Sequence, residues 1–110
     1  MIDETISKIE ARLRESGAIN EQAKRELAGL LATLKTEITE LSKTHADQAE
    51  SIAGFTQTSA HEATREEKNP ELLKLSLEGL VTSVDGFEKS HPRLVQLVNR
   101  ISTTLSNLGI

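Results

Sequence analysis

Apolar side chains recur at alternating intervals of three and four residues along most of this 110-residue chain. That spacing places them on one face of a helix. In the first half of the chain, two interleaved series each repeat every seven residues, the period of a left-handed coiled coil or helix bundle. One series is Leu27, Leu34, Leu41, Gln48 and Phe55, and the other is Leu31, Ile38, His45 and Ile52. We therefore predict one long helix from about residue 21 to residue 56, roughly 50 Å in length.

A further apolar series with the same alternation runs through the second half of the chain. It comprises Leu73, Leu77, Leu80, Val84, Phe87, His91, Leu94, Val98, Ile101, Leu105 and Leu108. Its phase continues across His91 and Pro92, although proline removes a helical hydrogen bond and biases the preceding residue away from the helical region. We predict a helix over about 70–90, a structural joint at Ser90, His91 and Pro92, and a helix over about 92–108. The pattern leaves open whether the joint kinks one helix or separates two.

Capping residues mark the beginning of the chain and its middle. A short amphipathic helix is predicted over about 3–16, with Gly17 as its stop and Asn20 as the N-cap of the next helix. Residues 57–69 contain no apolar side chain larger than alanine, so we predict a polar, solvent-exposed connector there. Asn69 followed by Pro70 is a strong signal for a new helix start.

The carboxyl end carries a stop signal of its own. Gly109 can adopt the left-handed conformation past the last turn, and Ile110 can then reach back to Leu105. This combination predicts a Schellman motif.

The composition favours helices over sheets. Aromatic residues make up 2% of the chain, so the core must come from Leu, Ile, Val and Ala. We predict an all-α fold in a single domain over residues 1–110, an elongated helical hairpin or bundle of three to four helices with coiled-coil-like contacts. A chain this short can bury only a modest apolar surface to offset the conformational entropy that it loses on folding. Self-association would bury more apolar surface, so we expect it here. The residues expected to form core or oligomer contacts are Leu27, Leu31, Leu34, Ile38, Leu41, Leu80, Val84, Phe87, Leu94, Ile101 and Leu105.

Charge and cysteine content narrow the classes of partner and chemistry. The chain has no cysteine, which excludes disulfides, thiolate metal ligands and cysteine nucleophiles. The net charge is −4, and the cations Lys89, Arg93 and Arg100 near the end have no aromatic neighbours for stacking, so the composition argues against nucleic acid as a partner. No apolar stretch approaches the ~18 residues of a membrane span, and the first residues do not resemble a signal peptide. We therefore expect a soluble, cytoplasmic protein.

Three histidines are the main candidates for chemistry, and each has a simpler interpretation. His91 could act as a general base, but only capping-type residues flank it, so we interpret it as part of the joint. The segment His61–Arg65 is similar to the zinc helix H-E-x-x-H but has arginine at the second ligand position, which removes the metal interpretation. His45 and Gln48 interrupt the apolar series, either to specify a partner register or because the helices diverge there; a pH-sensitive contact at His45 or His91 is a minor alternative. We predict no catalytic, cofactor-binding or metal site.

The end of the chain resembles a known family. FEKSHPRL at residues 87–94, NRI at 99–101 and LSNLGI at 105–110 match the pattern FExSHPxL, NRI and LxNLGI. This pattern is similar to the carboxyl-terminal signature of a family of short bacterial proteins known only as a domain of unknown function. NEQAKRELAGLLATL, at residues 20–34, resembles a second segment of that family. The resemblance implies a small helical bacterial protein and contributes no catalytic residue, cofactor or substrate.

Taken together, the residues predict a non-enzymatic oligomerisation or protein-interaction module. The expected assembly is a homo-oligomer, most simply a dimer, with a further protein partner that the sequence does not identify. The alternative is a small regulator that binds nucleic acid through its basic last helix. An enzyme with a site around His91, and binding of the last helix to a membrane surface, are weaker alternatives.

Overall fold

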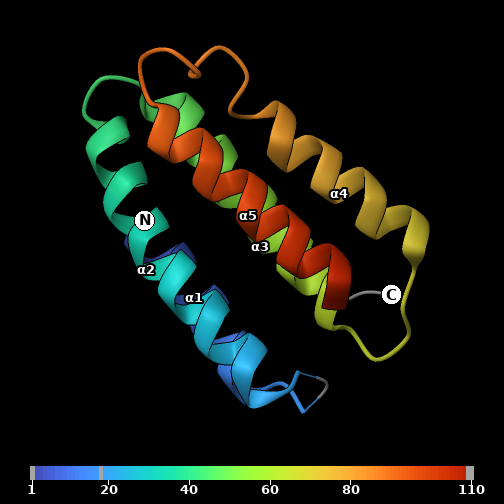
Figure 1. The fold of residues 1–110 in the computed structure, drawn as a ribbon. Coiled ribbons are helices and arrows are strands. Elements are labelled where there is room, and N and C mark those ends of the chain that lie inside the picture. The colour runs from blue at the N-terminus through green and yellow to red at the C-terminus, as the bar shows by residue number, and fades with distance from the viewer. Residues whose placement is uncertain (1, 18, 109–110) are drawn as a thin grey trace.

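The computed structural model describes residues 2–17 and 19–108, and it contains five helices and no strands in that part of the chain. They are α1 (Ile2–Glu15), α2 (Glu21–Ser42), α3 (Ala46–Thr64), α4 (Pro70–Thr82) and α5 (Pro92–Leu108) (Figure 1). The all-α prediction is confirmed at this level, whereas the expected three to four helices become five. The Schellman motif predicted at Gly109 and Ile110 lies outside the described residues.

Helix α3 lies at the centre and contacts all four other helices. Helices α1 and α2 pack together on one side of it, and α4 and α5 pack on the other (Figure 1). Helix α4 is at the edge, where it contacts α3 and α5 but neither α1 nor α2. The radius of gyration is 12.9 Å and the extents are 37 × 24 × 21 Å, close to the ~13 Å expected for a compact domain of this size. The prediction of an elongated molecule is therefore wrong.

The long helix predicted over residues 21–56 is broken by a tight turn at residues 43–45. His45 has φ −136° and ψ 64°, outside the helical region, while its N–H still donates to the Leu41 carbonyl oxygen at 2.8 Å. The chain reverses there, and α3 folds back along α2. The heptad pattern did not reveal the turn because Leu41 and Ile52 are buried in the same core after the reversal as they would be along one stripe.

The predicted connector over residues 57–69 is mostly helical. Helix α3 continues to Thr64, and only residues 65–69 connect it to α4. The small side chains that suggested an exposed segment instead lie in the core, where they allow neighbouring helices to approach closely. The buried residues of this half of α3 are Thr56, Ser59, Ala60, Glu62 and Ala63.

The helix predicted over residues 70–90 ends at Thr82, so the joint is a boundary between two helices. Residues 83–91 form a connector that includes Gly86, whose φ of +94° is readily adopted only by glycine. The His91 N–H donates to the Phe87 carbonyl oxygen at 2.8 Å, and Pro92 is the first residue of α5. Proline at this position loses no intrahelical hydrogen bond.

Asparagine side chains cap two helices as their sequence positions predicted. Asn20 Oδ1 accepts from the Ala23 N–H at 2.8 Å at the start of α2. Asn69 Oδ1 accepts from the Leu72 N–H at 3.1 Å at the start of α4. Each bond satisfies one of the N–H groups that a helix leaves unpaired in its first turn.

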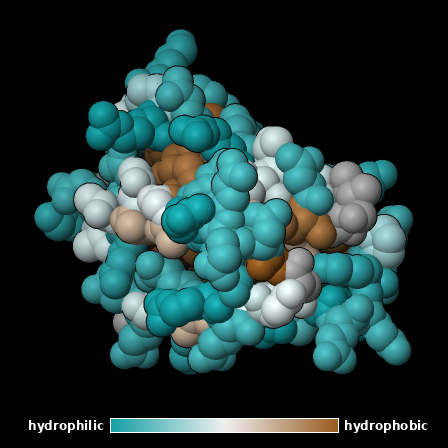
Figure 2. Space-filling view, turned by 60° about the horizontal axis from the view of Figure 1, so that its bottom comes forward, coloured by the Kyte–Doolittle hydropathy of each residue, from teal (hydrophilic) through white to brown (hydrophobic). Residues whose placement is uncertain are grey.

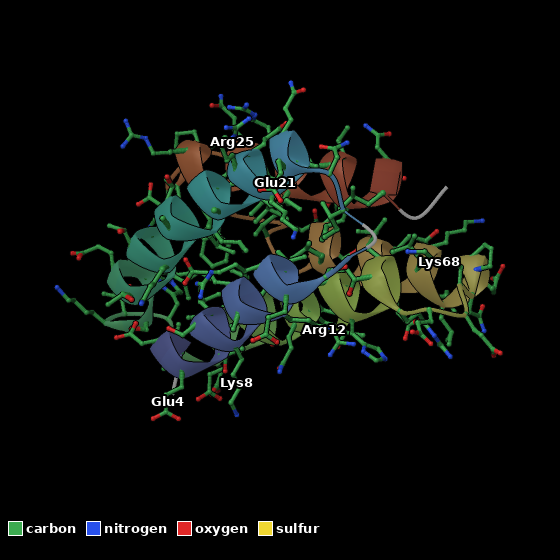
Figure 3. All side chains as sticks on the ribbon, turned by 90° about the horizontal axis from the view of Figure 1, so that it is seen from below. Glu4, Lys8, Arg12, Glu21, Arg25 and Lys68 are labelled. Carbon is green, nitrogen blue, oxygen red and sulfur yellow. The ribbon has the colours of Figure 1, made fainter. Side chains whose placement is uncertain are left out.

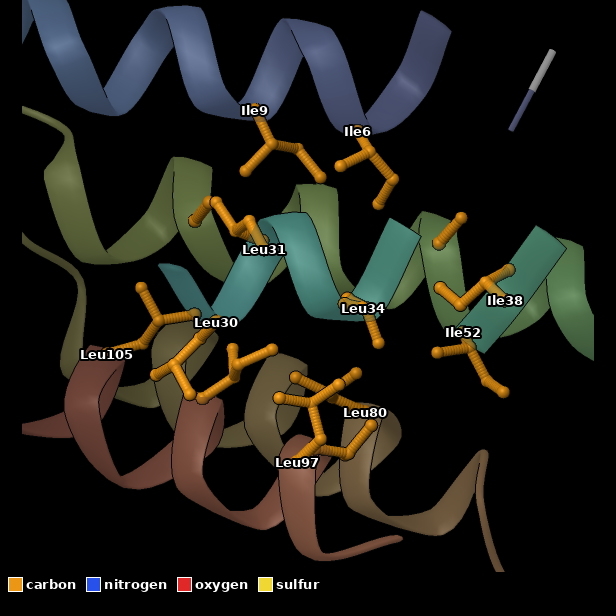
Figure 4. Packing of buried hydrophobic residues seen from close by; sticks show 14 of the residues in the cluster. Ile6, Ile9, Leu30, Leu31, Leu34, Ile38, Ile52, Leu80, Leu97 and Leu105 are labelled. Atoms are coloured by element: carbon orange, nitrogen blue, oxygen red, sulfur yellow. The ribbon is translucent and has the colours of Figure 1, made fainter. Parts of the chain in front are cut away.

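The core is a single cluster of mostly aliphatic side chains, to which all five helices contribute (Figure 4). Ile6 and Ile9 of α1 face the α2 and α3 residues, while Leu80, Leu97 and Leu105 close the opposite side (Figure 4). The structure places all eleven predicted core or oligomer residues here, each at most 8% exposed: Leu27, Leu31, Leu34, Ile38, Leu41, Leu80, Val84, Phe87, Leu94, Ile101 and Leu105. Because one chain already buries these side chains, any contact with another protein must use a different surface.

Candidate interaction surface

Three aromatic rings meet at the end of the molecule where α2 turns into α3. The ring centroids of His45 and Phe87 are 5.4 Å apart, those of Phe87 and His91 5.5 Å, and those of the two histidines 6.3 Å, all edge to face. Residue 45 belongs to the α2–α3 turn, and residues 87 and 91 belong to the α4–α5 connector. The cluster thus joins two connecting segments that are distant in sequence.

One ring nitrogen of each histidine in this cluster is hydrogen-bonded to a neighbouring hydroxyl group. Nδ1 of His45 is hydrogen-bonded to Thr44 Oγ1 at 2.8 Å, and Nδ1 of His91 to Ser90 Oγ at 2.9 Å. Neither imidazole forms an ion pair with a carboxylate in the described residues. Of the predicted joint, His91 takes part in the ring contacts, Ser90 is hydrogen-bonded to it, and Pro92 begins α5.

The segment His61–Arg65 forms the last turn of α3 and its C-cap. Glu62, 7% exposed, accepts from Arg65 Nη1 at 3.0 Å, and His61 Nε2 lies 3.8 Å from the same carboxylate. Across the described residues, no group of three or more His, Cys, Asp or Glu side chains could hold a metal ion. The ion pair between Glu62 and Arg65 therefore links the last turn of α3 to its C-cap residue.

The outward faces of α1 and α2 are polar and carry both signs of charge. Glu4, Lys8 and Arg12 follow one stripe of α1 at four-residue intervals, and Glu21 and Arg25 lie on the first turns of α2 (Figure 3). Side chains of opposite charge at this spacing are solvated neighbours on a helix surface. Within the described part of the chain, no helix is both long and apolar enough to cross a membrane.

Helix α4 has a different outward face. Four large apolar side chains are exposed among the described residues, and three of them are on α4: Leu72 at 42%, Leu75 at 53% and Val81 at 37%. The fourth is Phe55 of α3, at 41%. We call Leu72, Leu75 and Phe55 the α4 face; Val81 lies on the other flank of the helix, where it borders a groove. Figure 2 shows one side of the molecule as mostly hydrophilic, with hydrophobic residues confined to a few small patches.

Phe55 belongs to this face because it packs on a glycine of α4. A Cβ atom at Gly79 would lie 2.4 Å from the Phe55 ring, so the ring occupies the space that a side chain would need. Leu75 lies one turn before Gly79, on the same side of α4. The glycine therefore lets an aromatic ring of α3 extend the apolar surface of α4.

The other flank of α4 borders an open groove of about 770 Å³ that reaches Ser106 of α5. Apolar side chains of α4 form most of its wall, namely Pro70, Leu73, Leu77 and Val81. Lys74 and Glu78 stand along the groove, and neither forms an ion pair within the described residues. Their two charges are therefore available to a partner.

Sequence reasoning missed this surface because it followed the inward stripe of α4. Leu73, Leu77 and Leu80 satisfied the three-four spacing, and the remaining leucines were not assigned a side of the helix. The signal that was missed is an excess of apolar residues. The segment PELLKLSLEGLVT carries five leucines and a valine in thirteen residues, which is more than one buried face requires. A helix that is apolar on several sides at the edge of a domain is typical of an interaction site.

Comparisons with known proteins give one result. No curated protein and no solved structure matches the chain. The family model of the domain of unknown function DUF4404 matches residues 2–110. The match spans all five helices as well as the carboxyl-terminal motifs, and the chain therefore belongs to the DUF4404 family.

Proposed function

We propose that this chain is a helical protein-interaction module without catalytic activity, and that it binds its partner through the α4 face. The observation that carries the proposal is the placement of the exposed apolar side chains. All four large ones in the described residues lie on α4 or against it, although the other helices expose many more residues. Exposed leucines gathered on one helix do not stabilise a monomeric protein. In an interface they do, because the partner buries them.

The histidine environments are consistent with the absence of catalysis in this proposal. A general base needs a second group that orients it or shares its proton. His45 and His91 have hydroxyl neighbours and pack edge to face with Phe87 and with each other, an arrangement that serves packing. The proposal therefore includes no cofactor and no catalytic residue.

A protein partner is also favoured over nucleic acid by charge. Arg93 and Arg100 are exposed on α5, but the chain has 17 acidic side chains against 13 basic ones. Phosphate backbones are bound by dense basic surfaces, and single-stranded bases by exposed aromatic rings. The α4 face offers leucine and one phenylalanine instead, which match the apolar face of another helix.

Site-specific photocrosslinking in the source cell tests the proposal. A photoreactive phenylalanine derivative at position 75 lies at the centre of the α4 face, and the same group at position 32, which is exposed on α2, is the matched control. We expect discrete protein adducts from position 75 and none of comparable yield from position 32. Equal yields at both positions, or no adduct at either, would show that α4 is not a contact surface.

A further inference from the structure

We infer that the α4 face binds a second copy of the same chain, with the two α4 helices packed antiparallel. This inference rests on the proposed function and names its partner. A two-fold symmetric contact requires a surface that is complementary to itself. Helix α4 meets this requirement through its charges as well as its leucines.

Lys74 and Glu78 are the charges that specify the arrangement. Both are exposed, both stand along the groove, and neither has an ion-pair partner in the described part of its own chain. In an antiparallel pair with its two-fold axis at the level of Ser76, residue 74 of one copy lies opposite residue 78 of the other, because both are two positions from the axis. The contact therefore contains two Lys74–Glu78 pairs.

The parallel arrangement produces the opposite result. There each residue lies opposite its own copy, so Glu78 would face Glu78, Lys74 would face Lys74, and Glu71 would face Glu71. Like charges directly opposite each other destabilise a contact, whereas exposed opposite charges contribute modestly and select the orientation. The charge pattern of α4 thus favours the antiparallel pair.

The apolar residues fit the same symmetry. A two-fold axis across α4 brings like flank to like flank, so the α4 face of one copy meets the α4 face of the other, while the two grooves meet on the other flank. Helix α4 has 13 residues, about 20 Å at the usual rise, which limits the contact to the lower end of interface sizes. We therefore expect a reversible dimer that forms over the micromolar range rather than a permanent one.

Sedimentation equilibrium of the purified full chain, from low micromolar to near-millimolar concentration, tests the inference. One chain has a mass of 12.0 kDa, and we expect the average mass to rise toward twice this value with concentration. Leu75→Glu should keep the protein at the mass of one chain throughout. Ala32→Glu, which adds the same group to an exposed position of α2, should leave the rise unchanged.

Charge variants then test the orientation. In the antiparallel pair, Lys74→Glu replaces both Lys74–Glu78 pairs by pairs of carboxylates, so dimerisation should weaken by about threefold to tenfold. Glu78→Lys should weaken it similarly, and the double variant Lys74→Glu with Glu78→Lys should restore it. In a parallel pair each single variant only exchanges one like-charge contact for another, so single variants without effect would overturn the antiparallel arrangement.

The outcomes separate this inference from the proposed function. A chain that stays at one mass at every concentration, while position 75 still crosslinks to a different protein, overturns the second copy and leaves the interaction module intact. A dimer that Leu75→Glu does not dissociate overturns the role of α4 in self-association. Because residue 75 is exposed, circular dichroism of the variant should retain the helical spectrum of the unchanged chain, and the charge variants provide the same test without altering a leucine.

Discussion

Two buried serines show how single side chains depart from the general pattern of the core. Ser59 of α3 and Ser102 of α5 have buried hydroxyl groups that form no hydrogen bond. A buried hydroxyl without a partner lowers stability by the cost of removing it from water. The sequence indicated nothing unusual at either position, since serine in a polar segment suggests exposure.

We expect Ser59→Ala to increase the free energy of unfolding by about 1 kcal/mol, because it removes an unpaired buried hydroxyl. Ser51→Ala, at an exposed position of the same helix, provides the control for the change in helix propensity. Urea denaturation of both variants isolates the buried hydroxyl. An equal gain in the two variants would mean that the Ser59 hydroxyl has no cost.

The glycines give a second prediction at this scale. Gly29 is helical and exposed, with open space around it, so Gly29→Ala should stabilise the protein by about 0.5–1 kcal/mol. Gly79→Ala should not, because its Cβ would overlap the Phe55 ring and displace it. Thermal unfolding compares the two, and Gly79→Ala should show the gain when both it and its reference carry Phe55→Ala, because the ring is then absent. Equal stabilisation by both single variants would contradict the packing of Phe55 on Gly79.

At the scale of helices, the sequence predicted caps and apolar faces well and chain reversals poorly. Asn20 and Asn69 act locally, so their sequence positions were sufficient to place two helix starts. The turn at 43–45 depends on how α3 packs after the reversal, and a sevenfold repeat is compatible with both a straight helix and a hairpin. The contact of His45 with Phe87 and His91 became visible only once the turn and the α4–α5 connector were in place.

The ring cluster predicts the effect of a change at the turn. His45→Ala removes two edge-to-face contacts that join the α2–α3 turn to the α4–α5 connector, so we expect a loss of about 1–2 kcal/mol in the free energy of unfolding. His61→Ala, at an exposed position, should change it by less than about 0.5 kcal/mol. Urea denaturation at neutral pH measures both. A His45→Ala chain as stable as the His61→Ala chain would show that the cluster does not support the fold.

At the scale of the whole molecule, the fold class followed from composition, while the shape did not. Aliphatic periodicity identified which side chains of each helix face inward, as Leu34 and Ile101 illustrate, but it carried no information on which helices pack together. The excess of leucines in α4 indicated a second apolar side, but that Leu72 and Leu75 form it could be assigned only once the neighbours of α4 were known. The spacing of apolar residues within a helix determines which side faces inward, whereas the packing of the other helices determines which apolar side stays exposed.

The position of α3 at the centre determines where this chain tolerates mutation least. Residues 56–64 are rich in alanine, serine and threonine, as a linker would be, yet they lie between neighbours on several sides. A larger side chain at Ala60 or Ala63 would have to displace adjoining helices rather than project into water. In a saturation mutagenesis screen, we therefore expect Ala60 and Ala63 to tolerate increases in side-chain size least, although their segment resembles a linker in composition.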